Sequence, residues 1–444
     1  MKKQQNLAFT NCNVIDGNLD SKIIKDCVIL VNNETVVNGK PTGKIEGLGK
    51  RSEIEIPDDY RMIDLNGKYV IPGLINAHAH LIGDGQPRDL STPEKQKKLI
   101  RFLGTAIGKR FALKKMRQNV TNALNSGVTT IRAVGDPHGY DLLIRKEVQE
   151  GKLSGPRIFA AGRVVCPSGG HGIAMGRIAD SPWEFRREVR NAVYNGADFI
   201  KIMSTGGVSD STRIGQAGRM EMTLEEISAA CDEAHRAGLK VASHVHSPLG
   251  IKEALLGGVD TIEHGAPLDN KLIGLFKKNP NSLKGYSALV PTLAVIINVT
   301  DFDIKHTRFS PIQYENAVII RERMMSAFLD GLKGGIKIGI GTDAGVVLTP
   351  HYDVFKELVH FVEYGKISPR QAIYHATKCN AEILGIENET GTIEVGKSAD
   401  FVAFNENPSD DVTVLSKPSM VVCQGNLLEN PVVKRIKAVD EIVS

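Results

Sequence analysis

The chain has 444 residues, of which 41% are hydrophobic and 24% are charged, proportions typical of an ordinary globular protein. Its net charge of +4 is too small to favour binding to nucleic acid or to an anionic membrane. No run of about 18 or more apolar residues occurs, so the sequence predicts no membrane-spanning helix.

Two further features bear on where the protein works. The six cysteines are widely separated and form no CxxC pair, so we expect neither a disulfide framework nor a structural zinc site. The N-terminal segment has two lysines but no apolar stretch behind them, unlike a secretory signal. We therefore expect a cytoplasmic protein.

Residues 1–68 contain short predicted strands separated by turn signals, among them Leu7–Val14 and Cys27–Val31. So few strands cannot bury a sheet face by themselves. We interpret this region as the N-terminal part of a small β-sandwich that needs strands from elsewhere in the chain.

Between residues 69 and 388, short apolar runs alternate with longer amphipathic segments that have helical periodicity. Eight of these runs are predicted strands: Val70–His80, Gly127–Asp136, Pro156–Val165, Ala197–Ser204, Lys240–His246, Val259–Gly265, Ser287–Val295 and Ile336–Gly345. Eight strand–helix alternations predict an α/β fold, a TIM-type (β/α)8 barrel. A doubly wound sheet would instead need a glycine-rich phosphate loop after its first strand, where this chain has His-Ala-His.

The last part of the chain is helical and then β-rich again. A long helical stretch covers about residues 354–385, and strands are predicted at Gly391–Val395, Asp400–Phe404 and Met420–Cys423. We expect residues 389–444 to pair with residues 1–68, so that both chain ends form one small β-sandwich domain outside the barrel.

The first barrel strand carries two histidines, His78 and His80, two positions apart. The period of two in a strand places both side chains on one face, where two imidazoles can begin a zinc-like site. An isolated HxH pair is as often two polar residues at a sheet rim as a metal site.

Later strands add candidates at the same place in the fold, because catalytic groups of these barrels sit at the carboxyl ends of the strands. The candidates are Lys201 on the fourth strand, His244 on the fifth, His264 on the sixth and Asp343 on the eighth. Convergence of five strands on one rim is poorly explained by coincidence. The sequence therefore predicts a divalent metal centre.

Six motifs in this order resemble the amidohydrolase superfamily: GKYVIPGLINAHAHL, ADFIKIMSTGG, VASHVHS, TIEHG, GTDAG and GTIEVGKSADFVAF. The resemblance covers nearly the whole chain. Within the superfamily the chain is most similar to the metal-dependent carboxypeptidase and dipeptidase branch, which includes Xaa-Pro dipeptidase (prolidase) and arginine carboxypeptidase.

The resemblance implies two divalent metal ions, for which we expect zinc. It places His78 and His80 on one ion and His244 and His264 on the other. It also implies that Lys201 is carbamylated and bridges the ions, and that Asp343 is both a ligand and the proton-transfer residue.

General chemistry is compatible with the roles of the lysine and the aspartate. A lysine ammonium has no acceptor atom, so Lys201 could ligate a cation only after losing its proton and reacting with CO2. For a lone strand lysine, an ion pair is the more usual role. A carboxylate such as Asp343 that ligates a metal beside a water can act as general base and later as general acid.

Three more histidines are candidate substrate-binding residues. His246 shares a strand face with His244, so either of them could be the fifth-strand ligand; the resemblance favours His244 and leaves His246 near the substrate. His171 lies on a glycine-rich loop after the third strand, and His138 follows the second strand. For both loop histidines, an ordinary surface position is about as good an interpretation.

The resulting hypothesis is a hydrolase that cleaves an amide or peptide bond in a small substrate, such as a dipeptide or N-acyl amino acid, by attack of a metal-bridging hydroxide. Alternatives on the same scaffold are a deaminase, a cyclic-amide (imidazolone-type) hydrolase, a phosphotriesterase or a lactonase. A non-enzymatic assembly protein is a further alternative, and metal content per chain would separate these classes. From relatives we also expect a homo-oligomer.

Overall fold

The computed structural model describes residues 5–34, 36–37, 40–89 and 92–443. These residues form two compact units. The first comprises Met1–Asn76, Thr121–Thr130 and Tyr352–Lys434, and the second comprises Ala77–Val120, Ile131–His351 and Arg435–Ser444.

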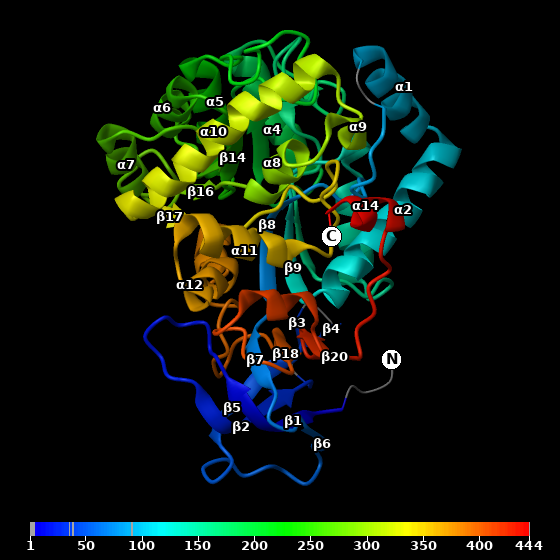
Figure 1. Cartoon of the computed structure of the whole chain (residues 1–444), viewed down its shortest axis with the longest axis vertical. Coiled ribbons are helices and arrows are strands. Elements are labelled where there is room, and N and C mark those ends of the chain that lie inside the picture. Colours follow the sequence, from blue (N-terminus) through cyan, green and yellow to red (C-terminus); the bar gives the residue numbers. More distant parts are fainter. Residues whose placement is uncertain (1–4, 35, 38–39, 90–91, 444) are drawn as a thin grey trace. The chain divides into compact units, whose positions relative to one another are not determined.

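One sheet in the first unit takes strands from both chain ends (Figure 1). Its order is β20-β19-β18-β7-β1-β2-β5, and β6 pairs with β1. The strands are β1 (Leu7–Val14), β2 (Ile24–Asn32), β5 (Lys44–Lys50), β6 (Arg61–Asp64), β7 (Tyr69–Pro72), β18 (Phe401–Phe404), β19 (Met420–Cys423) and β20 (Asn426–Glu429). The antiparallel pair β7–β18 joins the two ends, which confirms that they build one β-rich unit.

Alternating apolar side chains of this sheet form its core. The rings of Phe9 on β1 and Phe401 on β18 pack edge to face with centroids 5.0 Å apart, so residues far apart in sequence share one buried layer. The predicted strand Gly391–Val395 is wrong, because those residues form turns and irregular backbone. A separate pair, β3 (Val36–Val37) and β4 (Lys40–Pro41), is antiparallel.

The helical stretch predicted for residues 354–385 is confirmed in the first unit. It contains α11 (Val354–Gly365), α12 (Pro369–Tyr374), the π-helical turn η2 (His375–Cys379) and α13 (Asn380–Leu384). The helix α12 begins with a capping box, in which Ser368 and Gln371 each bond the backbone of the other. No helix in the described part of the chain is long and apolar enough to cross a membrane.

Short strands that alternate with helices make up the second unit, together with the carboxyl-terminal halves of β8 and β9. The strands are β8 (Leu74–Ala79), β9 (Val128–Ala133), β10 (Arg157–Ala160), β11 (Val165–Cys166), β12 (Arg177–Ile178), β13 (Ile200–Met203), β14 (Val241–Val245), β15 (Thr261–His264), β16 (Ala288–Val290) and β17 (Lys337–Ile338). They form a sheet of order β10-β9-β8 and a sheet of order β12-β11-β13-β14-β15-β16-β17.

Strands β13 to β17 pair in parallel with their neighbours. Backbone hydrogen bonds also link the two sheets at both margins: the Asp198 amide donates to the Ala160 carbonyl, and the Ala77 amide donates to the Ile340 carbonyl, each over 2.9 Å. The carboxyl ends of these strands therefore lie at one edge of the α/β unit.

The predicted strand Ser287–Val295 is too long, because residues 293–295 begin the helix α8 (Leu293–Thr300). Two other predicted strands are interrupted. The first, Val70–His80, divides at Gly73 into β7, which joins the sheet of the first unit, and β8. The third, Pro156–Val165, divides into β10 and β11, and β11 pairs with both β12 and β13. In both cases the apolar run is continuous in sequence, but its two parts pair with different strands. Hydrophobic periodicity does not predict such a change of partner.

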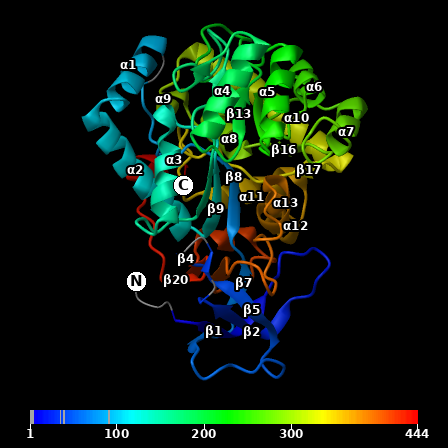
Figure 2. The same ribbon diagram turned by 180° about the vertical axis from the view of Figure 1, so that it is seen from behind.

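Helices cover the outside of these strands, and α4 to α7 pack side by side in chain order (Figure 2). The helices of this unit are α1 (Pro93–Leu103), α2 (Ala106–Asn125), α3 (Tyr140–Gln149), α4 (Pro182–Tyr194), α5 (Leu224–Arg236), α6 (Pro248–Gly257), α7 (Asn270–Lys277), α8 (Leu293–Thr300), α9 (Ile304–Thr307), α10 (Pro311–Gly334) and α14 (Lys437–Val443). Capping boxes start α5 at Thr223 and α10 at Ser310. Such caps fix where each helix begins, and so how long the preceding loop is.

Candidate metal centre

All six predicted metal ligands line one cavity of about 360 Å³ in the second unit. His78 lies near the end of β8 and His80 directly follows that strand. Lys201 lies within β13. His244 lies near the end of β14, His264 ends β15, and Asp343 follows β17. His246 and His171 line the same cavity, whereas His138 does not.

Two sets of three side chains are close enough to share an ion. One consists of His244, His246 and His264, and the other of His78, His264 and Asp343; within each set the ligand atoms lie within 4.8 Å of one another. Imidazole nitrogens and carboxylate oxygens are the donors that zinc and similar divalent metals accept. His264 belongs to both sets, so the two candidate positions are adjacent.

A buried ion-pair network holds His78 in place. Its Nδ1 lies 2.6 Å from a carboxylate oxygen of Glu263, whose other oxygen accepts from Arg132 at 2.7 Å and from the Thr261 hydroxyl at 2.6 Å. Although burial alone would raise the pKa of Glu263, Arg132 and His78 lower it to about 2. The ionised carboxylate therefore accepts the Nδ1–H of His78, which fixes the ring so that Nε2 lies on the side of Asp343.

The other imidazole of β8 is held by backbone. The Nδ1 of His80 lies 2.6 Å from the Gly135 carbonyl, and the Nε2 atoms of His78 and His80 are each 3.4 Å from the same Asp343 oxygen. Burial would raise the pKa of Asp343, but the neighbouring imidazoles and Lys201 lower it to about 2. This carboxylate is therefore ionised and central to the cluster.

A tight seam brings the loop after β8 against the loop after β17. A side chain at Gly83 would overlap the Gly345 backbone, and one at Gly345, whose φ is +101°, would overlap the His80 carbonyl. Asp343 itself has a φ of +57°, a conformation that is costly outside glycine and concentrates at functional sites. The seam thus fixes the relative positions of His80 and Asp343.

Lys201 differs from the other members of the cluster, because its amine is a hydrogen-bond donor in a buried position. Its side chain is only 2% exposed, yet its Nζ has no hydrogen-bond partner among the described residues. Burial lowers the pKa of its amine to about 8, against the opposite effects of the Glu263 and Asp343 carboxylates. A buried amine without a partner is expensive, so this position fits a lysine that is chemically modified or faces a ligand.

Histidines dominate the side of the cavity formed by β14 and β15. The ring of His244 lies 4.5 Å from that of His246 and 4.6 Å from that of His264, measured between centroids. Burial, reinforced by neighbouring imidazoles, lowers the pKa of His244 and His264 well below the usual value. Burial, reinforced by His171 and Arg323, lowers the pKa of His246 to about 3. The rings are therefore neutral, the form in which imidazole binds metals.

Several ring nitrogens on this side lack partners. The Nε2 of His244 and the Nδ1 of His246 are buried without a hydrogen bond to any described residue, whereas the Nδ1 of His264 lies 2.8 Å from the Thr292 hydroxyl. Unpaired buried polar atoms that converge on one point are what a metal site looks like without its ion. The donor set therefore fits a divalent metal.

His171 reaches this cluster from the loop after β11. Its Nδ1 lies 2.7 Å from an Asp210 oxygen, and its ring centroid is 4.3 Å from that of His244. Burial alone would lower the pKa of His171, but Asp210 raises it. A side chain at Gly207 would collide with the His171 ring, so the glycine there leaves room for that ring.

His138 lies elsewhere. It is exposed at the start of α3, and its Nε2 lies 3.0 Å from the Ile100 carbonyl. The structure thus brings His246 and His171 to the metal cluster and leaves His138 outside the cavity.

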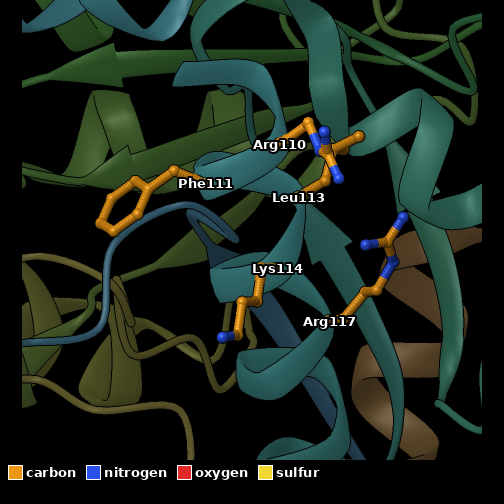
Figure 3. Close-up of a pocket in the computed structure, with 5 residues that line it drawn as sticks. All are labelled: Arg110, Phe111, Leu113, Lys114 and Arg117. Carbon is orange, nitrogen blue, oxygen red and sulfur yellow. The ribbon is translucent and has the colours of Figure 1, made fainter. Parts of the chain in front are cut away.

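A second depression, of about 480 Å³, follows the surface of α2 (Figure 3). Arg110, Leu113 and Arg117 project to one side of the helix, and Phe111 projects to the other. Arg117 is already bonded to Glu147 through two nitrogens. This depression contains no metal-ligating set, and only Phe111 also lines the cavity.

Three residues that organise the site were absent from the sequence predictions: Glu263, Arg132 and Asp210. Glu263 and Arg132 are charged residues inside apolar strands, and opposite charges in two buried strands could have predicted an ion pair. Asp210 lies in an irregular loop, where no periodic signal exists.

Comparisons with known proteins agree with this geometry. Residues 69–428 match the profile of the amidohydrolase family. A solved structure of a candidate prolidase from Bifidobacterium longum is 36% identical, covers 99% of this chain and 98% of its own, and superposes with a TM-score of 0.84. The structure of a Xaa-Pro dipeptidase with methionine bound in its active site is 29% identical, with coverage of 96% and 100% and a TM-score of 0.80.

Among characterised sequences, the ochratoxinase of Aspergillus niger is 26% identical over 401 residues, which cover 83% of this chain and 78% of the relative. The family profile spans well over half of the chain, and both solved structures cover almost all of it. The chain therefore belongs to the amidohydrolase family, within its dipeptidase-like branch, and is a hydrolase that acts on carbon–nitrogen bonds.

Proposed function

We propose that this protein is a metal-dependent hydrolase of an amide or peptide bond in a small substrate, such as a dipeptide or an N-acyl amino acid. One observation carries the proposal: Lys201 Nζ, His244 Nε2 and Asp343 Oδ1 are buried without a hydrogen bond to any described residue, and all three residues line one cavity. Groups that are costly to leave unpaired are retained where a ligand satisfies them.

The assignment of ligands is the one that the family resemblance implies, and it overlaps both triads: His244 and His264 belong to one, and His78 and Asp343 to the other. We propose that His78 and His80 hold one divalent ion and that His244 and His264 hold the other, with Asp343 as a further ligand. Bound ions would polarise the scissile carbonyl and lower the pKa of a water molecule. Zinc suits this set of imidazoles and carboxylates.

Lys201 completes this proposal as a carbamate. Its neutral amine would attack the carbon of CO2 and release one proton, which yields a carboxylate able to reach both positions. The buried position of Nζ, which has no hydrogen bond to any described residue, supports this role. A carbamate signal should appear in the carbon NMR spectrum of protein loaded with zinc and isotope-labelled bicarbonate, and should be absent from Lys201→Ala.

Asp343 supplies proton transfer. Its carboxylate is ionised and lies at the centre of the cluster, where it can take a proton from the attacking water and return it to the leaving nitrogen. Glu263 does not take part in this step, because it is already committed to His78, Arg132 and Thr261.

His171 and His246 are the proposed polar contacts to the substrate near the metals. The solved Xaa-Pro dipeptidase with methionine in its active site supports an amino-acid portion in the substrate. A neutral His246 can donate only an ordinary hydrogen bond, whereas His171 is kept basic by Asp210 and suits an anionic group. His138 does not line the cavity, so the structure gives no support for a substrate contact at this residue.

The closed (β/α)8 barrel and the β-sandwich belong to the same proposal. Hydrogen bonds from Asp198 to Ala160 and from Ala77 to Ile340 support closure of the two sheets into one ring, with the metal ligands at its carboxyl rim. Residues 69–388 would form the barrel, with 1–68 and 389–444 outside it.

The direct test is a screen of zinc-loaded protein against dipeptides and N-acyl amino acids, with metal counted per chain. Hydrolysis of an amide with about two ions per chain supports the proposal. Deamination of a purine or opening of a cyclic amide, with one ion per chain, would replace it. Hydrolysis of phosphotriesters or lactones in preference to every amide would also overturn it.

A further inference from the structure

We propose that the cavity selects substrates in which the group next to the scissile amide is bulky and apolar, such as a leucine, methionine or phenylalanine side chain or an alkyl or aryl acyl group, and that it rejects basic side chains. This inference rests on the proposed function, because it names the substrate class of the same site. It follows from the part of the cavity lining that holds no metal ligands.

One wall of the cavity is the apolar face of α1. Leu99, Ile100 and Leu103 line the cavity, at the spacing that puts residues on one side of a helix, while Lys97 and Lys98 are exposed. An amphipathic helix normally buries its apolar side against the core. Here the apolar side faces a cavity, which a substrate can fill.

A second wall comes from α8, an almost entirely apolar helix. Val295, Ile296 and Val299 are at least nine-tenths buried and line the cavity. Met324 of α10 also lines it, and methionine adapts its shape to an irregular partner. A cavity of about 360 Å³ with such walls is at the lower end of the range of roughly 300–1,000 Å³ for small-molecule sites.

Apart from the candidate metal ligands, His171, His246 and Arg308, four polar side chains of the lining already bond to other protein groups. Gln96 and Gln313 both donate their amide groups to the Ser209 carbonyl, over 3.1 and 2.5 Å. Arg88 and Lys115 are both bonded to the buried Asp84. A polar substrate side chain would lose its water here without gaining a matching partner, and this loss is the basis of strong discrimination.

The charges of the lining are also unfavourable for a basic substrate. Its acidic residues are Asp210, which is bonded to His171, and Asp343, which lies among the metal ligands. By contrast, Arg308 lines the cavity, is exposed, and makes no ion pair with any residue that the structure describes. An arginine or lysine side chain would therefore meet a free cation and no free acid.

The test uses zinc-loaded protein and two dipeptide series, Xaa-Gly and Gly-Xaa, so that either side of the amide can face the apolar walls. In at least one series, leucine, methionine and phenylalanine should exceed alanine in kcat/KM by about tenfold or more, and lysine should fall about 100-fold below methionine. If lysine, arginine or glutamate equals the apolar residues in both series, the inference is wrong.

A matched pair of variants tests whether the apolar face of α1 is responsible for the preference for apolar substrate side chains. Ile100→Gln places an amide in the cavity lining and should reduce the advantage of phenylalanine over alanine by about tenfold. Ile107→Gln makes the same change on α2, where the side chain is 75% exposed and outside the lining, and should leave the profile unchanged. Equal profiles in the two variants would contradict the role of α1.

Calorimetry separates this inference from the proposed function. Free leucine, methionine and phenylalanine should bind the zinc-loaded protein at least about tenfold more tightly than free lysine and arginine. If no dipeptide or N-acyl amino acid is hydrolysed, the proposed function fails, and the binding order alone decides the inference. Tighter binding of lysine or arginine would overturn it.

Discussion

The two sides of the metal centre differ in what surrounds their imidazoles. On the carboxylate side, His78 and His80 each have a ring nitrogen at 2.6 Å from an acceptor, and Asp343 lies between them. On the imidazole side, His244 and His246 each have a buried ring nitrogen without a hydrogen bond to any residue that the structure describes.

We expect from this difference that the two sides depend on metal to different degrees. The carboxylate side is preorganised by protein groups that orient its ligands before any ion binds. The imidazole side gains its missing partners only from an ion or a substrate. We therefore expect the two sides to respond differently to substitution, acid and chelation.

The largest effect is expected from Asp343→Asn on the carboxylate side. Asparagine keeps the shape of the side chain but cannot take a proton, so turnover should fall by about 10²–10⁴-fold while the fold and much of the metal remain. Steady-state kinetics, metal analysis and thermal unfolding measure the three quantities. Activity within a few-fold of the parent would remove Asp343 from the proton-transfer step.

Glu263→Gln tests preorganisation itself. It removes the charge that orients His78 and neutralises Arg132, so metal affinity should fall about 10–100-fold. Glu188→Gln is the matched control, since this glutamate is also buried and bonded to arginines but lies outside the cavity. Equal loss of metal affinity in both variants would mean that Glu263 acts only on overall stability.

His246→Ala tests the imidazole side, and we expect a smaller effect than for the two variants above. Loss of a neutral hydrogen bond is worth about 1 kcal/mol, so KM for carboxylate-bearing substrates should rise about fivefold relative to their amidated counterparts. Metal content should stay the same. Loss of one ion would show instead that His246, not His244, is the ligand from β14.

In metal-free protein, the two sides should lose their contributions to stability at different pH values. His246 has a folded pKa of about 3, below its unfolded value, so the unfolded chain binds the extra proton and stability falls as the pH drops from about 6.5 towards 3. Glu263 and Asp343 have folded pKa values of about 2, so their contribution is lost only below about pH 4.5.

Unfolding of the metal-free protein followed across this range should therefore begin to weaken near pH 6.5, and added zinc should delay the loss. His246→Phe should remove part of the upper phase and leave the lower one. A metal-free protein whose stability is flat between pH 6.5 and 5 would show that the imidazole side is not buried as described.

Much of the fold could be predicted from the sequence, because strands with a period of two and glycine-ended helices are local signals. The positions of the candidate ligands were accessible for the same reason: His78 and His264 lie at or near the ends of strands that a parallel α/β arrangement brings to one edge, and Lys201 lies in a strand between them in the sequence. The β-rich chain ends were also accessible, because neither could form a stable sheet alone.

The remaining features depend on register and on neighbours distant in sequence. Glu263 and His264 are consecutive, so strand alternation predicts opposite directions, yet both serve the site because His264 has a φ of +71° at the end of β15. The ion pair of Glu263 with Arg132 spans 131 residues. The low pKa of His246 arises from burial and other positive groups, which no local pattern reports.

The seam between Gly83 and Gly345 has a consequence for the way this sequence can vary. Neither position has room for even a methyl group, because the added atom would overlap backbone that cannot rotate away. In a library randomised at both positions and selected for folding, glycine should be recovered almost exclusively, whatever substrate is supplied. In a library selected for activity, the residue recovered at a position such as Ile100 should change with the substrate supplied. Sequencing of the selected variants would therefore distinguish positions that the fold restricts from positions that the substrate restricts.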